Sequence, residues 1–177
     1  MYAAHFAASL AVKGCAPRAP LWALVTAAFL PDFVWIVLAR AGVEPELPPR
    51  GFFDDWSHSL LMIVVTSTLF ALLFWKKDRV VAAAVWIAGL SHLILDFLIH
   101  PARLALYPHS AIHLGWSLWS YGQEKSSLGP NHYWWIEAAF IVLLLAVYGF
   151  SWRRVSPDWR IPAASCLLVA GLHLLSV

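Results

Sequence analysis

Histidine and aspartate side chains recur in this chain inside segments that are otherwise apolar enough to form lipid-spanning helices. In the clearest segment, His92, Asp96 and His100 follow one another at every fourth position. In a helix this spacing places the three side chains on one stripe. A charged group at the centre of a membrane helix costs about 2.5–3.5 kcal/mol on insertion scales. Such residues face a bundle interior and are candidates for a functional site.

Three further residues of the same types lie in other apolar segments. Asp32 directly follows Pro31, which we expect to bend its helix and free a backbone carbonyl. His58 opens a third segment, and His5 lies in a short apolar piece at the N-terminus. Counted at 1.5 Å per residue from the helix ends, Asp32 and His92 lie about 12 Å below the same membrane face. Histidine with carboxylate is ligand chemistry for zinc or a similar divalent cation, so one metal site is predicted.

The composition is that of a membrane protein. Hydrophobic residues make up 61% of the 177 residues and charged residues 12%, with a mean hydropathy of +0.70. A soluble domain carries about 25% charged residues, so this chain cannot cover a surface that faces water. A net charge of +2 without a long basic run argues against nucleic acid as a partner. Cys15 and Cys166 fit no paired motif and are interpreted as free thiols.

The elements that must position these residues are helices. We predict an all-α integral membrane protein, a single transmembrane domain over residues 1–177 with four to five spanning helices and a short N-terminal helix. A spanning helix needs about 20 apolar residues. The predicted spans are residues 20–40, 58–75, 80–100, 133–152 and the shorter 161–177, after a short piece at 2–13. Asp55 or Ser57 can cap the helix that His58 opens.

Basic residues predict the orientation. Alternating loops place eight of the twelve Lys and Arg residues on one side and four on the other. The richer side is cytoplasmic by the positive-inside rule, and tryptophans mark both boundaries. The loops at 41–57 and 101–131 are then on the outer side of the membrane, and the site faces the outer leaflet.

Four short motifs occur in an order that resembles a known family. They are Ala3-Ala4-His5-Phe6-Ala7-Ala8-Ser9, Phe29-Leu30-Pro31-Asp32, Trp56-Ser57-His58-Ser59-Leu60-Leu61 and Gly89-Leu90-Ser91-His92-Leu93-Ile94-Leu95-Asp96. Together they are similar to the motifs of the bacterial inner-membrane metal-dependent hydrolases of the YdjM-like type. The resemblance covers the first hundred residues and implies a divalent metal and a hydrolytic reaction. It also implies a multi-pass protein of the bacterial inner membrane, in which the outer loops are periplasmic and the site faces the periplasmic leaflet. The order of ligand types is also similar, more loosely, to that of the zinc-dependent phospholipases C.

The chain departs from this family pattern at two places. Val34 stands where the family often has a second aspartate, and Phe53 where it often has a histidine. Asp54 and Asp55 replace an Arg-Gly pair, so a basic anchor for a phosphate-like substrate is missing. These departures leave open whether another residue substitutes or activity is lost.

A reaction and its residues follow as expectations. Asp32, His58, His92 and Asp96 would form the first metal shell, and His5 would join through a second metal or a bridging Asp96. His100 is a further candidate ligand. Zinc lowers the pKa of a bound water to about 7, which suits attack on an ester or phosphoester. Asp55 or Glu137 would serve as general base. A site at this depth suits a lipid headgroup or another amphiphile in the bilayer.

Purely structural roles compete with these assignments. His92 and Asp96 could be a hydrogen-bonded pair between helices, Asp32 could be satisfied at the Pro31 bend, and His58 could lie among headgroups. His109 and His113 are predicted to be solvated loop residues, and His173 is predicted to snorkel to the interface. A non-catalytic subunit of a larger membrane complex is therefore the main alternative. Haem binding fits poorly beside the carboxylates, and a transporter would need polar residues through the whole membrane.

Overall fold

The computed structural model describes residues 2–44, 46–47, 51–52, 54–99, 104–115 and 132–175. Its helices are α1 (Tyr2–Cys15), α2 (Leu21–Ala28), α3 (Leu30–Arg40), α4 (Asp55–His58), α5 (Leu60–Trp75), α6 (Arg79–Ile99), α7 (His132–Trp152) and α8 (Arg160–Leu174). Four two-residue strands form two antiparallel hairpins, β1 (Glu46–Leu47) with β2 (Gly51–Phe52) and β3 (Leu104–Ala105) with β4 (His113–Leu114). The predicted all-α class is confirmed.

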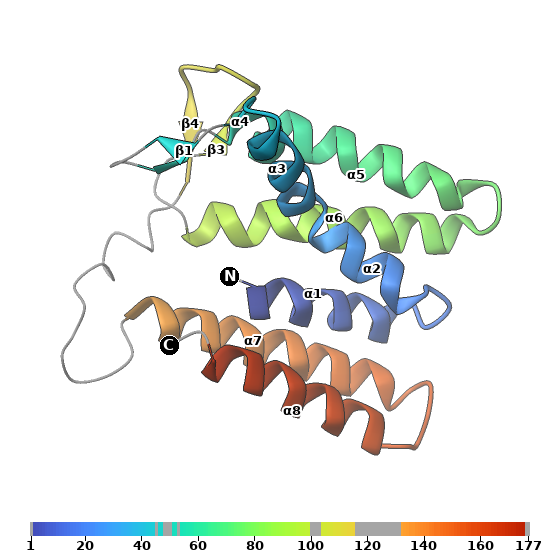
Figure 1. Ribbon diagram of the computed structural model, residues 1–177. Coiled ribbons are helices and arrows are strands. Elements are labelled where there is room, and N and C mark those ends of the chain that lie inside the picture. The colour runs from blue at the N-terminus through green and yellow to red at the C-terminus, as the bar shows by residue number, and fades with distance from the viewer. Residues whose placement is uncertain are drawn as a thin grey trace.

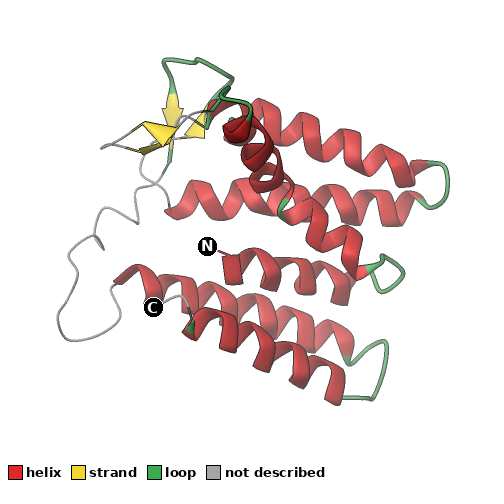
Figure 2. Cartoon of the chain, viewed as in Figure 1, coloured by secondary structure: helices red, strands yellow, loops and turns green. Residues whose placement is uncertain are grey.

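The helices α5, α6, α1, α7 and α8 lie side by side, with α1 between α6 and α7 (Figure 1). The helix α2 crosses α1 and α6, and the hairpins lie together with α4 at one end of the bundle (Figure 2). The N-terminal end of α1 and the C-terminal end of α6 are near this same end. Segments that are distant in sequence therefore meet here.

Fewer helices than predicted are long and apolar enough to cross a membrane. Among the described residues, Arg79–Leu98 and Trp134–Trp152 meet the requirement. The pair α2 and α3 meets it as one span bent by 53°. The helices α5 and α8 are apolar but shorter. By length and composition the described chain holds two or three candidate spans, whereas the sequence predicted four to five.

The bend between α2 and α3 is where Pro31 predicts it. Pro31 is in the first turn of α3, where its missing N–H breaks no helical hydrogen bond but prevents the helix from continuing unbroken. The predicted helix start at His58 is wrong. His58 ends the short α4, and the hydroxyl of Ser59 accepts the Met62 N–H at 3.4 Å as the cap of α5. Neither Asp55 nor Ser57 caps α5.

Small side chains make α1 the centre of the bundle. This helix buries five alanines, Ala3, Ala4, Ala7, Ala8 and Ala11, together with Leu10. Side chains of this size let neighbouring backbones approach closely. A Cβ added to Gly14 would lie 3.0 Å from the carbonyl oxygen of Tyr148 on α7. The short N-terminal helix is confirmed, and its close contact with α6 and α7 fixes where His5 lies.

The helices α5 and α6 approach even more closely. A Cβ added to Gly89 of α6 would lie 2.3 Å from Oγ and 2.7 Å from Cβ of Ser67 on α5. Ser67 is fully buried. Only glycine fits at position 89 at this helix separation. The contact holds α5, and therefore α4 before it, against the helix that carries His92.

Candidate metal centre

The helix α6 presents His92 and Asp96 to the interior one turn apart, as their spacing predicts. Both are buried, with 1% and 5% of their surface exposed. His92 Nε2 lies 3.1 Å from Asp96 Oδ2. Because these residues share one helix, their separation is set by helix geometry alone and needs no distant contact.

His5 of α1 joins this pair from across the helix interface. Its Nε2 lies 3.4 Å from Asp96 Oδ1, so the two oxygens of Asp96 face two different histidines. The rings of His5 and His92 stack with centroids 4.1 Å apart and planes 7° apart. His5 is 2% exposed. These three residues form a buried group whose ligand atoms all lie within 4.8 Å of one another.

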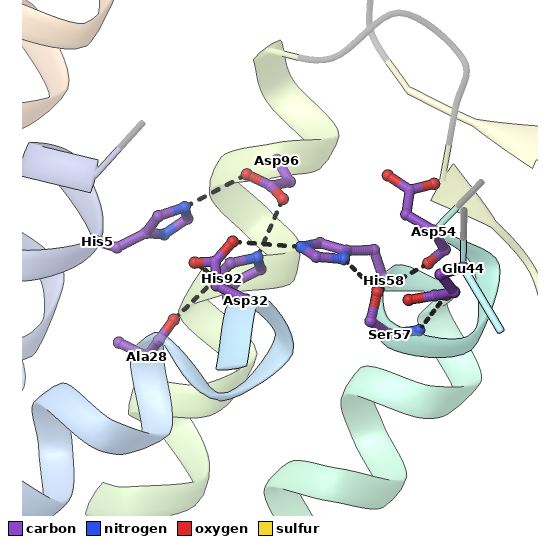
Figure 3. A network of polar contacts seen from close by, with 9 residues as sticks. All are labelled: His5, Ala28, Asp32, Glu44, Asp54, Ser57, His58, His92 and Asp96. Carbon is purple, nitrogen blue, oxygen red and sulfur yellow. Dashed lines mark hydrogen bonds and ion pairs between the residues drawn. The ribbon is translucent and has the colours of Figure 1, made fainter. Parts of the chain in front are cut away.

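Asp32 and His58 approach from the other side (Figure 3). His58 Nε2 lies 3.5 Å from Asp32 Oδ1, and Asp32 Oδ2 lies 3.9 Å from His92 Nδ1. Asp32, His58 and His92 form a second group of possible ligands within 4.8 Å. The side chains of His58 and Asp32 are 13% and 24% exposed, so this side of the cluster is the more open one.

A backbone contact determines which nitrogen of His92 is available. His92 Nδ1 lies 2.8 Å from the carbonyl oxygen of Ala28, the last residue of α2. A carbonyl only accepts, so Nδ1 carries a proton, and in the neutral ring Nε2 has the lone pair. Nε2 faces Asp96, and among the described residues it has no hydrogen-bond partner. Metal-ligating histidines in proteins are oriented by the same kind of contact.

The orientation of His58 follows the same logic. Ser57 Oγ donates to the carbonyl of Asp54 at 3.1 Å and lies 2.7 Å from His58 Nδ1. Both ring nitrogens of His58 are therefore engaged, Nδ1 by Ser57 and Nε2 by Asp32. Two histidines thus each have Nδ1 held by the protein and direct Nε2 at a carboxylate oxygen.

This donor set fits a divalent cation. Three imidazoles and two carboxylates are the ligand types of zinc and similar metals. A ring nitrogen and a carboxylate oxygen repel each other unless a proton or a metal cation lies between them. Within the part of the chain that the structure describes, Asp32 Oδ2 and His5 Nδ1 are also buried without a hydrogen-bond partner. These atoms could be satisfied by a bound cation.

The field at His58, which precedes α5, also favours positive charge. Burial alone would lower the pKa of His58. The hydrogen bond with Asp32 and the charges of Asp96 and Asp54 outweigh burial, so this pKa lies above its ordinary value. The same carboxylates that stabilise a proton here would attract a metal cation.

The two predicted general bases lie outside both ligand groups. Asp55 is buried and its Oδ2 accepts the N–H of His109 at 3.0 Å, which ties α4 to the loop before β4. Glu137 of α7 is 3% exposed, accepts the Ala4 N–H at 3.4 Å and lies 3.6 Å from His173. His100, the sixth predicted metal ligand, lies outside the described residues.

The remaining histidines divide between surface and core. His109 and His113 are exposed, in agreement with prediction. The prediction that His173 extends outward is wrong, because its side chain is buried, with 5% of its surface exposed. It lies against Glu137, and the Trp134 ring stacks on it with centroids 4.3 Å apart. Sequence reasoning also missed Glu44, which is completely buried; its place in a loop carried no signal of this.

The comparisons with known proteins add no relative. No protein-family model, no curated protein and no solved structure matches this chain. The resemblance to the inner-membrane hydrolases therefore stays a prediction. The chemistry of the site must be argued from its own geometry.

Proposed function

We propose that this protein is a membrane-bound metal-dependent hydrolase that acts on an ester or phosphoester. The observation that carries the proposal is the pair of oriented histidines. His92 and His58 each have Nδ1 engaged by the protein and direct Nε2 at a carboxylate oxygen. That arrangement is suited to binding a cation. Burying these ionisable side chains only to hold two helices together would cost free energy without such a benefit.

His5, His92 and Asp96 would hold the cation on the buried side of the cluster. Two histidines and a carboxylate are the protein ligands of one class of catalytic zinc site, where a fourth position stays open. When bound, such a cation polarises a carbonyl or phosphoryl oxygen and lowers the pKa of a water molecule to about 7. The ring of His92 is held by Ala28, so its nitrogen is placed before any ligand arrives.

Asp32 and His58 occupy the open side, where a substrate would enter. Their side chains are the more exposed members of the cluster and lie 3.5 Å apart. A carboxylate beside an imidazole can hold and pass a proton, so this pair is suited to acid–base work or to a second cation. It takes the role that the sequence predicted for Asp55 and Glu137, whose carboxylates are engaged by backbone N–H groups elsewhere.

The position of the cluster favours an amphiphilic substrate. Asp96 is three residues from the end of α6, which corresponds to a depth of about 5 Å. A group at this depth meets the headgroup region of a bilayer, so a lipid headgroup ester or phosphoester is the substrate class. The excess of basic residues on the opposite loops supports a periplasmic site in a bacterial inner membrane.

Metal analysis of the purified protein in detergent tests the proposal. We expect zinc or a similar cation at about one to two atoms per chain, and slow hydrolysis of phospholipid or ester substrates that Asp32→Asn reduces. Purified protein with no metal above background, even after exposure to zinc, would refute the proposal of a metal-dependent hydrolase. A Soret band would then indicate haem, and a featureless spectrum with co-purifying membrane proteins would favour the complex subunit.

A further inference from the structure

Two buried glutamates contact the backbone directly before two of the site histidines. Ser57, which precedes His58, donates its N–H to Glu44 Oε1 at 2.9 Å. Ala4, which precedes His5, donates its N–H to Glu137 Oε1 at 3.4 Å. Each glutamate comes from a segment that provides no side chain to the ligand groups. The same arrangement therefore occurs twice, at both histidines that do not belong to α6.

Glu44 holds the turn that contains His58. It is 0% exposed and also accepts the Trp56 N–H at 2.5 Å, so one oxygen receives both amides at the start of α4. Figure 3 shows its contact with Ser57. Its second oxygen is buried and has no hydrogen-bond partner among the described residues. The hydroxyl of Ser57 is hydrogen-bonded in turn to His58 Nδ1 at 2.7 Å. A continuous path leads from Glu44 through Ser57 to the imidazole.

Glu137 holds the first turn of α1. The N–H groups of a first turn have no partner within their helix and favour an anion. The second oxygen of Glu137 lies 3.6 Å from His173, whose backbone carbonyl accepts the indole N–H of Trp134 at 3.3 Å. The helices α7 and α8 thus together hold the carboxylate of Glu137 in place. This carboxylate in turn holds the first turn of α1. His5 is the next residue after the contact.

The two glutamate contacts act on histidines whose positions the geometry of α6 does not set. His92 and Asp96 are spaced by one helix, whereas His5 and His58 must be brought to them from separate segments. Burial of a carboxylate is costly unless hydrogen bonds compensate it, and apolar contacts would give more stability at lower cost. We propose that Glu44 and Glu137 are positioning residues that set His58 and His5 for metal binding. This inference rests on the proposed function.

The test compares zinc affinity among matched variants of the full-length protein in detergent. Loss of an outer-shell contact typically costs 10–100-fold in metal affinity, and we expect a loss of about that size from Glu44→Ala and from Glu137→Ala. Glu44→Gln and Glu137→Gln keep an oxygen that accepts the same N–H groups. They should stay within about threefold of wild type, since position and not charge is what the glutamates supply.

Asp78 provides the control. It accepts the N–H groups of Val80 and Val81 at the far end of α6, so Asp78→Ala removes a comparable helix-end contact away from the cluster. Zinc affinity should be unchanged in this variant. An equal loss in Asp78→Ala, or full affinity in both glutamate-to-alanine variants, would overturn the inference. If Glu44→Ala does not fold, Ser57→Ala interrupts the same path and should give the same loss.

A second measurement needs no metal. In ¹⁵N spectra of metal-free protein, the His58 Nδ1 resonance should report the hydrogen bond with Ser57, and Glu44→Ala should shift this resonance while Asp78→Ala leaves it unchanged. Absence of zinc binding in the wild type would refute the proposed function alone. An unchanged His58 spectrum in Glu44→Ala would refute the positioning role whether or not zinc binds.

Discussion

His92 donates its Nδ1–H to the backbone carbonyl of Ala28 over 2.8 Å. The contact joins the middle of α6 to the end of α2, immediately before the 53° bend into α3. It therefore links the ligand on α6 to the helix pair that carries Asp32. One hydrogen bond fixes both the tautomer of a site histidine and the distance between two site elements.

This contact separates structure from coordination at position 92. His92→Asn retains a side-chain N–H near the place of Nδ1, so the bond to Ala28 can persist, but it removes the Nε2 atom. We expect loss of zinc binding with thermal stability in detergent close to wild type. His92→Leu removes both atoms and should also lower stability, because the Ala28 contact is lost. Equal zinc binding in wild type and His92→Asn would contradict the assignment of Nε2.

Asp96→Asn should nearly abolish zinc binding while the protein stays inserted and folded. The amide has the shape of the carboxylate and can still hydrogen-bond to His5 or His92, but it lacks the negative charge that a divalent cation requires. Hydrogen bonds inside membrane proteins average about 0.6 kcal/mol, so the change in stability should be small. The measurements are bound zinc and melting temperature. Unchanged zinc content would place the metal elsewhere.

Gly89→Ala should destabilise the protein by about 1–3 kcal/mol, because the new methyl group overlaps Ser67. Ser67→Gly removes the opposing side chain and should restore much of the loss in the double variant. Gly149→Ala is the matched control, since a Cβ there meets nothing within 4 Å. Thermal unfolding in detergent would compare the stability of the wild type with that of Gly89→Ala, the double variant Gly89→Ala/Ser67→Gly and Gly149→Ala. Equal effects at positions 89 and 149 would mean that the close α5–α6 approach is not required.

Lys13 ties the loop between α1 and α2 to α1. Its ammonium donates to the carbonyl oxygens of Pro17 at 2.6 Å and Ala19 at 2.8 Å. Lys13→Met keeps the apolar stem and should cost about 1–2 kcal/mol through the lost charge-assisted bonds. Lys77→Met removes a charge at an exposed position between α5 and α6 and should be close to neutral. Similar losses of stability in both variants would show that removal of a positive charge, and not loss of the loop contact, destabilises the protein.

The predicted orientation can be checked by labelling single cysteines with an impermeant reagent in intact cells, after replacement of Cys15 and Cys166. Cysteines at positions 51 and 125 should react, and a cysteine at position 77 should not. Labelling after cell lysis controls for accessibility of each site. The opposite pattern would move the candidate metal centre to the cytoplasmic leaflet and require a different substrate argument.

Features that depend on local geometry could be predicted from the order of residues alone. The spacing of His92 and Asp96 predicts their common face because one helix sets it. Pro31 predicts the bend between α2 and α3 because its ring and missing N–H act on its own turn. The low content of charge predicts a membrane protein, since too few polar side chains remain to cover a surface in water.

Only the tertiary structure decided which distant residues meet. His5 contacts Asp96, and His58 contacts Asp32, through packing between helices that no local spacing encodes. The same packing gives Glu137 the N–H of Ala4 instead of a place among the ligands. It also buries His173, whose position near the end of the chain predicted exposure. Long-range pairing depends on how helix surfaces fit together, as where Gly89 admits Ser67, and a pattern along one helix does not contain that fit.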